Sequence, residues 1–194
     1  MNQERVVALA PAAPGDLLGR TAASERRLVR RAQAGSSEAL EELFRREWPL
    51  AYRAAYLVVH DAAAAEDIAQ EAFLAAVRAL DRFDRRRPFA PWMHRIVVNR
   101  AIDAARARAL RCEVAAPERA AEAAAPAAGE QLSDELLDAL RELSPEHRAV
   151  VVLRYLLDCT PGEIARALEL PRGTVNSRLR RALDRLGPLL EEQR

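Results

Sequence analysis

The C-terminal part of the chain, residues 160–186, constrains the fold most, because it predicts two helices joined by a tight turn. Thr160, Pro161 and Glu163 form a capping box with proline at the first helical position. Pro171 marks the break, since proline can start a helix but cannot continue one. The second helix then repeats apolar residues at helical spacing, namely Val175, Leu179, Ala182, Leu183 and Leu186. This pattern is typical of a helix-turn-helix, and the alternative is an ordinary surface helix hairpin.

The outer face of the second helix is basic and rich in hydrogen-bonding groups. Its candidate DNA contacts are Arg172, Thr174, Asn176, Ser177, Arg178, Arg180 and Arg181. Thr174, Asn176, Ser177 and Arg180 are candidates for base edges, and the other arginines are candidates for phosphates. Arg178 lies nearer the apolar stripe than Arg181 does, so it could instead pair with a neighbouring acid. The chain is therefore predicted to bind DNA.

Charge is segregated along the chain, although the net charge is only +1. Residues 78–111 hold ten arginines against three aspartates, and residues 113–146 hold nine acids against two arginines. Residues 172–185 hold five arginines and one acid. Two basic surfaces divided by an acidic connector suit two contacts with one polyanion.

Helical periodicity recurs along the chain and no strand pattern is found, so we predict an all-α fold. Ser24 and Asp61 are the expected N-caps of two helices, and Pro49 predicts a kink or break inside a third. Besides the helix-turn-helix, the expected helices cover residues 24–33, 36–59, 61–80, 89–108, 133–143 and 144–157.

Two segments interrupt this pattern. Residues 1–23 mix Ala, Pro and Gly without steady periodicity, which predicts a flexible extension. Residues 112–132 are a low-complexity Ala/Glu/Pro stretch, which predicts a flexible linker. The expected architecture is two small helical domains, residues 24–111 and 133–194, on a tether.

Both predicted domains resemble the extracytoplasmic-function (ECF, group IV) sigma factors of the sigma-70 family. The N-terminal block resembles sigma region 2 over DAAAAEDIAQEAFLAAVRALDRFDRRRPFAPWMHRIVVNRAIDAAR, with its acidic AED-Q-E-F helix, D-R-F-D turn and P-F-x-x-W segment. The C-terminal LSPEHRAVVVLRY and PRGTVNSRLRRAL resemble region 4. The resemblance covers most of residues 25–187. It implies that the first domain binds core RNA polymerase and the promoter −10 element, and that the second binds the −35 element.

An acidic, hydrogen-bonding ridge lies off the apolar face of the helix at residues 61–80, which carries Ile68, Ala72, Phe73 and Val77. Its residues are Glu66, Asp67, Gln70 and Glu71. The resemblance implies that this ridge docks on the clamp helices of the polymerase β′ subunit. The alternative is a merely solvated helix face.

The next helix separates an apolar stripe from a polar side. The stripe consists of Met93, Val97, Ala101 and Ala104, and the other side carries Trp92, Arg95, Asn99, Asp103 and Arg106. An aromatic ring that can stack on a base, an amide and arginines suit capture of melted DNA. The resemblance implies that the preceding loop with Arg85, Arg86 and Arg87 helps to hold a flipped −10 base. Trp92 could equally be a core aromatic residue.

The resemblance therefore predicts an alternative sigma factor that promotes transcription initiation and has no catalytic activity. We expect promoter DNA, the polymerase β′ clamp helices and β flap, and an anti-sigma factor as partners. The runner-up is a stand-alone helix-turn-helix regulator, which would lack the acidic ridge and the arginine loop. Cys112 and Cys159 lie far apart and form no CxxC motif, so we expect no metal and no cofactor. No membrane-spanning run or signal peptide is recognised, which predicts a cytoplasmic protein without membrane insertion.

Overall fold

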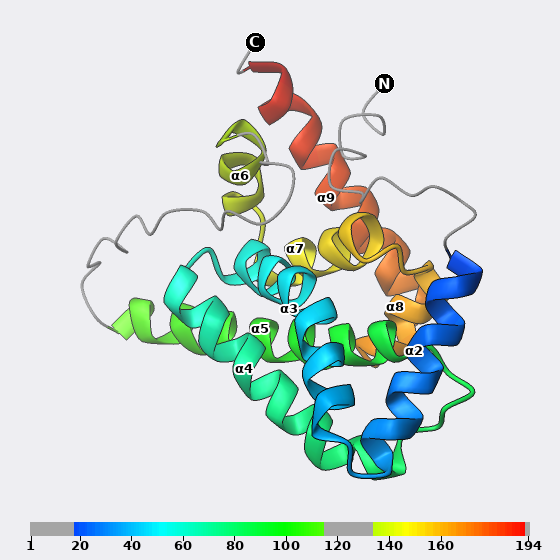
Figure 1. Ribbon diagram of the computed structural model, residues 1–194. Coiled ribbons are helices and arrows are strands. Elements are labelled where there is room, and N and C mark those ends of the chain that lie inside the picture. Colours follow the sequence, from blue (N-terminus) through cyan, green and yellow to red (C-terminus); the bar gives the residue numbers. More distant parts are fainter. Residues whose placement is uncertain (1–17, 115–133, 193–194) are drawn as a thin grey trace.

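The computed structural model describes residues 18–114 and 134–192, and within these ranges every regular element is a helix (Figure 1). The first group is α2 (Leu18–Gln33), α3 (Ser37–Val59), α4 (Ala62–Ala79), the short 3-10 helix η2 (Leu80–Arg82) and α5 (Phe89–Val114). The second is α6 (Asp134–Arg141), α7 (Pro145–Val151), the π-helical turn η3 (Val152–Leu156), α8 (Pro161–Ala167) and α9 (Arg172–Glu192). The predicted all-α fold is confirmed.

Side-chain caps set the starts of several helices where the sequence predicts them. Asp61 Oδ1 accepts a hydrogen bond from the Ala64 N–H at 3.0 Å and caps α4. The capping box of α8 is complete, because Thr160 Oγ1 accepts from the Glu163 N–H while Glu163 Oε2 accepts from the Thr160 N–H at 2.8 Å. These bonds satisfy N–H groups that have no partner inside the helix.

Three predicted boundaries are wrong. Helix α2 begins at Leu18, since the residues before Ser24 can continue a helix, and the Ser24 hydroxyl accepts from Arg46 at 3.3 Å. Helix α3 runs through Pro49 without a break, with the rings of Trp48 and Tyr52 stacked 6.3 Å apart across that position. Helix α5 continues past residue 108 to Val114.

Some predictions fall on segments that the structure does not describe. They concern residues 1–17 of the predicted extension, the predicted linker beyond Val114, and the helix start at Ser133.

Helices α2 to α5 form one packed unit around α5. The predicted core residues Met93, Val97 and Ala101 are fully buried. Ala104 is only half-buried, and the buried surface also includes Val98, Ile102 and Ala105, which the predicted stripe omits. Helix α5 is therefore covered on a broader face than its amphipathic pattern indicates.

The second unit holds the helix-turn-helix α8–α9, which packs on α6 and α7. Val175, Ala182 and Leu186 are fully buried along the predicted stripe, Leu179 is buried and Leu183 is half-buried. The turn reverses direction at Glu169, whose φ of 54° lies in the left-handed region. This conformation closes the end of α8 through a hydrogen bond from the Leu170 N–H to the Ala165 carbonyl at 2.9 Å.

The two units pack on each other, because α3 and α5 both contact α7 (Figure 1). Buried side chains from both units form one continuous cluster. The space between the units is thus an apolar seam with polar contacts along one edge.

His60 lies at this seam as the C-cap of α3, with φ 52°. Burial lowers the pKa of His60 from 6.5 to about 3, and the charges of Arg148 and Arg141 on the second unit lower it further. Burial also lowers the pKa of Arg148 to about 10, which leaves that guanidinium charged at neutral pH. The folded protein therefore holds a neutral imidazole next to a buried cation.

This environment predicts a loss of stability in mild acid. His60 stays neutral in the fold but protonates in the unfolded chain below pH 6.5, so its contribution is complete above 6.5 and falls as the pH drops toward 3. The slope for one such group is about 1.4 kcal/mol per pH unit. Urea unfolding of wild type and His60→Asn at several pH values below 6.5 should give a smaller acid loss for the variant, since asparagine tolerates the left-handed backbone.

The difference between the two proteins is the informative quantity, because His147, whose pKa is also lowered by burial, is present in both. Equal pH slopes would contradict a buried neutral His60.

Candidate polymerase and nucleic-acid interface

The acidic ridge, defined as Glu66, Asp67, Gln70 and Glu71, is exposed on α4. The opposite face of α4 is buried through Ile68, Ala72 and Phe73, as predicted, but Val77 is 41% exposed rather than buried. Only weak contacts engage the ridge: Gln70 donates to Glu66 at 3.3 Å, and Glu71 lies 3.9 Å from Arg100. The ridge is therefore free to meet a basic partner.

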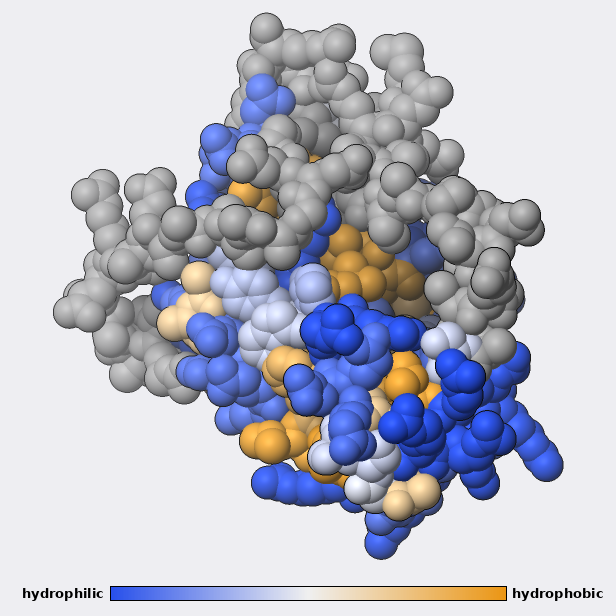
Figure 2. Space-filling model, viewed as in Figure 1, coloured by the Kyte–Doolittle hydropathy of each residue, from blue (hydrophilic) through white to orange (hydrophobic). Residues whose placement is uncertain are grey.

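Apolar side chains lie beside this ridge and were not singled out from the sequence. Phe44 on α3 and Leu74 on α4 are 40% and 55% exposed. Phe44 stacks on Trp48 with ring centroids 4.9 Å apart and also touches Phe73. In Figure 2, the lower part of the molecule, where α3 and α4 run in Figure 1, shows apolar spots within a hydrophilic surface. The exposed aromatic pair is the signal that could have been found, since Phe44 and Trp48 are four residues apart.

The arginine loop, defined as Arg85–Arg87, is exposed between η2 and α5. Gln33 at the end of α2 fixes its base, because Gln33 Nε2 donates to the carbonyl oxygens of Leu80 at 2.8 Å and Phe83 at 3.0 Å. Asp84 shapes the loop by accepting from the Arg86 N–H at 3.0 Å. Three guanidinium groups are thus presented to solvent on an anchored turn.

Trp92 follows this loop and is half-buried. Its ring packs against Phe83 and Phe89, with centroid distances of 4.7 and 5.5 Å. Helix α5 is fixed there by Glu25, which accepts from the Phe89 N–H at 2.7 Å. Trp92 therefore combines packing on the core with a partly accessible ring, which leaves its predicted stacking on a base as a prediction.

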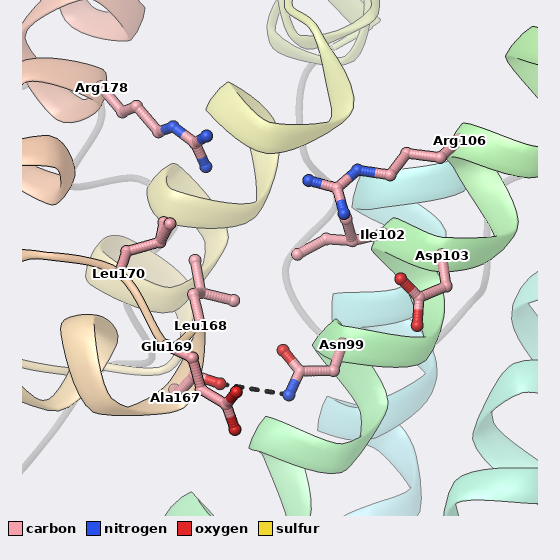
Figure 3. Close-up of a pocket in the computed structure, with 9 residues that line it drawn as sticks. All are labelled: Asn99, Ile102, Asp103, Arg106, Ala167, Leu168, Glu169, Leu170 and Arg178. Carbon is pink, nitrogen blue, oxygen red and sulfur yellow. Dashed lines mark hydrogen bonds between the residues drawn. The ribbon is translucent and has the colours of Figure 1, made fainter.

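The α5 polar face, defined as Arg95, Asn99 and Arg106, is turned toward the second unit. Asn99 Nδ2 donates to the Ala167 carbonyl oxygen at 3.1 Å, a partly buried hydrogen bond drawn in Figure 3. Arg95 pairs with Glu169 at 3.2 Å, and Arg106 pairs with Glu146 on α7 at 2.8 Å. All three predicted −10 contacts of this face thus engage the helix-turn-helix unit.

A cavity of about 260 Å³ lies between α5 and the helix-turn-helix turn. Its polar wall includes Asn99, Asp103 and Arg106, and Arg178 extends toward it from α9 (Figure 3). The remaining lining residues are Ile102, Ala167, Leu168, Glu169 and Leu170. Arg178 therefore lies at the seam, apart from the other predicted contacts of α9.

The basic face of α9 carries the other predicted −35 contacts. Arg172, Asn176, Arg180 and Arg181 are exposed along one side, together with Ser177. Ser177 Oγ donates to the Thr174 carbonyl at 2.9 Å, and Arg180 lies 4.0 Å from Asp184, too far for a strong ion pair. These side chains are available to a DNA groove.

Metal chemistry finds no support in the described part of the chain, where no group of three or more His, Cys, Asp or Glu residues could hold a metal ion. Burial raises the pKa of the Cys159 thiol to about 11, so this thiol stays protonated. No described helix is long and apolar enough to cross a membrane.

An exposed acidic ridge, an anchored arginine loop and a helix-turn-helix with a basic outer face define a helical DNA-binding protein with a separate protein-docking surface. Family models match both units. Residues 43–111 match sigma-70 region 2, and residues 133–186 match sigma-70 region 4.

Relatives and solved structures agree with these matches. The chain is 34% identical to the RNA polymerase sigma factor CarQ of Myxococcus xanthus, over 84% of this chain and 96% of CarQ. It is 31% identical to the ECF sigma factor SigW of Bacillus subtilis, over 73% and 83% of the two chains. The structure of CnrH, solved with the cytosolic domain of CnrY, matches with a TM-score of 0.65 and 29% identity, over 88% of this chain and 99% of that chain. The chain therefore belongs to the ECF RNA polymerase sigma factors of the sigma-70 family and acts in transcription initiation.

Proposed function

We propose that this sigma factor divides its work among the surfaces described above. The acidic ridge binds the β′ clamp helices, the arginine loop and the α5 polar face handle the melted −10 element, and the basic face of α9 reads the −35 element. The observation that carries this proposal is the presence of these three surfaces on separate elements, α4, α5 with its preceding loop, and α9.

The chemistry of each surface fits its proposed partner. Carboxylates on α4 suit a basic coiled coil, and exposed guanidinium groups suit phosphates. Arginine and asparagine on α9 can each make two hydrogen bonds to a base edge, worth about 1–3 kcal/mol of discrimination for each good pair. Binding and orientation explain the activity, so we propose that the protein is not an enzyme and works in the cytoplasm with the polymerase.

Partner binding extends this proposal. The β flap is the expected contact of the second unit on the polymerase. CnrH is a relative that was solved in complex with another protein, CnrY. RpoE of Bartonella quintana, a fold neighbour at 23% identity, was solved in complex with the anti-sigma factor NepR. We propose that this chain is likewise held by an anti-sigma factor.

Run-off transcription with core polymerase on genomic fragments tests the proposed function. The full chain should direct discrete start sites that core polymerase alone does not use. Failure to bind core polymerase or to direct any start site would contradict it.

Reversing charge on the acidic ridge should abolish core binding. In Asp67→Arg/Glu71→Arg both side chains are exposed, so the protein should keep its fold while complementarity to a basic surface is lost. Co-purification with core polymerase is the measurement. The matched control is Glu135→Arg/Asp138→Arg on exposed positions of α6, which carries the same charge change and should bind normally. Normal binding by the ridge variant would show that the ridge is only a solvated face.

The basic face of α9 should separate affinity from specificity. Arg181→Ala should weaken binding to all promoters alike and reduce the salt dependence by about one phosphate contact. Asn176→Ala and Arg180→Ala should instead relax preference at particular −35 positions. Binding to a library of −35 variants at several salt concentrations measures both effects. A uniform loss for all three variants would overturn the assignment of base-reading residues.

The −10 surface should act in strand opening. Asn99→Ala and Arg85→Ala/Arg86→Ala/Arg87→Ala should spare core binding but reduce open-complex formation on a fully paired promoter. A pre-melted bubble with the same −10 sequence should rescue a pure opening defect, whereas a base-reading defect should persist on it. Wild-type transcription of the paired promoter by both variants would show that this surface does not touch DNA.

A further inference from the structure

We infer that the helix-turn-helix turn competes, within the same chain, with promoter DNA for the α5 polar face. This inference rests on the proposed role of that face in −10 recognition. It concerns the free protein, in which the two units lie against each other.

The groups that the turn offers resemble those of DNA in hydrogen-bonding type. The Ala167 carbonyl oxygen accepts from the Asn99 amide at 3.1 Å, as a base oxygen would. The Glu169 carboxylate accepts from Arg95 at 3.2 Å, as a phosphate would. Because these donors lie within the seam, a melted strand can reach them only after the two units separate.

The turn is shaped for this contact. Glu169 has φ 54°, a conformation that glycine or asparagine adopts more readily at the end of a helix. A glutamate at this position places a carboxylate beside Arg95, which glycine would not. The turn therefore carries the charge that its neighbour on α5 needs, at a position where its own fold favours a smaller residue.

The strength of closure comes from the apolar part of the seam. Exposed ion pairs such as Arg95–Glu169 contribute little, since the carboxylate side chain is 83% exposed. Ile102, which is buried, lines the cavity together with Leu168 and Leu170. A short apolar contact edged by weak ion pairs suits a closed state that a partner can open.

The seam leaves the proposed polymerase contacts free. Both the acidic ridge and the arginine loop remain exposed in the closed arrangement. Core polymerase can therefore dock on the closed chain before the α5 polar face is released. Closure then restricts single-stranded DNA binding to the polymerase-bound protein.

Reversible cross-linking of the full chain tests this inference. Asp103 and Glu169 line the same cavity from opposite units and have exposed side chains, and neither is a proposed DNA contact. Asp103→Cys/Glu169→Cys, in a background with Cys112→Ser and Cys159→Ala, is treated with a short bifunctional thiol reagent that dithiothreitol cleaves. The matched control pair is Glu142→Cys/Arg185→Cys, which replaces an ion pair of 3.7 Å within the second unit.

The seam pair should cross-link rapidly in the free chain and at least tenfold more slowly with core polymerase bound, whereas the control pair should react equally in both states. The locked chain should bind a random-sequence single-stranded oligonucleotide pool at least tenfold more weakly than the same chain after cleavage. Seam cross-linking that core polymerase does not slow, or equal binding by locked and cleaved chains, would overturn the inference.

A substitution provides an independent measurement. Glu169→Arg should raise affinity for the same oligonucleotide pool about two- to fivefold over Asp158→Arg, the range expected for an exposed charge pair. Asp158 is a matched control because it is exposed, acidic and also left-handed, with φ 49°. Equal affinities would count against competition at the turn. Run-off transcription by the cleaved chain separates the two claims, because it fails only if the proposed function is wrong.

Discussion

The packing of α5 on both units is the interaction on which the rest of the structure depends. One side of α5 fills the core of the first unit through Met93, Val97 and Ala101, all fully buried. Its other side meets α7 and the helix-turn-helix turn through the α5 polar face. Because a single helix serves both contacts, the position of the second unit decides whether the −10 surface is accessible.

Charge distribution follows the same division. The acidic ridge and the basic face of α9 point to solvent, where screening keeps their mutual attraction small. The seam instead holds polar groups at close range, including the buried cation Arg148 beside neutral His60. Such buried groups contribute little net stability but penalise alternative packings, which suits a contact that must be specific without being permanent.

Local interactions explain what could be predicted from the sequence. The capping box at Thr160, the cap at Asp61 and the apolar stripe through Val175 depend on residues within one or two turns, and all are found. Ile102 was not predicted as buried, and Asn99 was predicted only as a DNA contact, because their partners are supplied by a segment about seventy residues away in sequence. The amphipathic pattern of α5 cannot reveal a second covered side, since amides and arginines are equally compatible with solvent, DNA or a turn.

A distance measurement between the two units tests most directly whether one face of α5 serves two exclusive partners. Labels at Arg78→Cys on α4 and Asp184→Cys on α9, both exposed, would be placed in a background with Cys112→Ser and Cys159→Ala. Electron–electron double resonance should give a single short distance for the free chain and a distinctly longer one for the chain bound to core polymerase and promoter DNA. The same short distance in both samples would contradict it, because the −10 strand would then have to be read with the seam still closed.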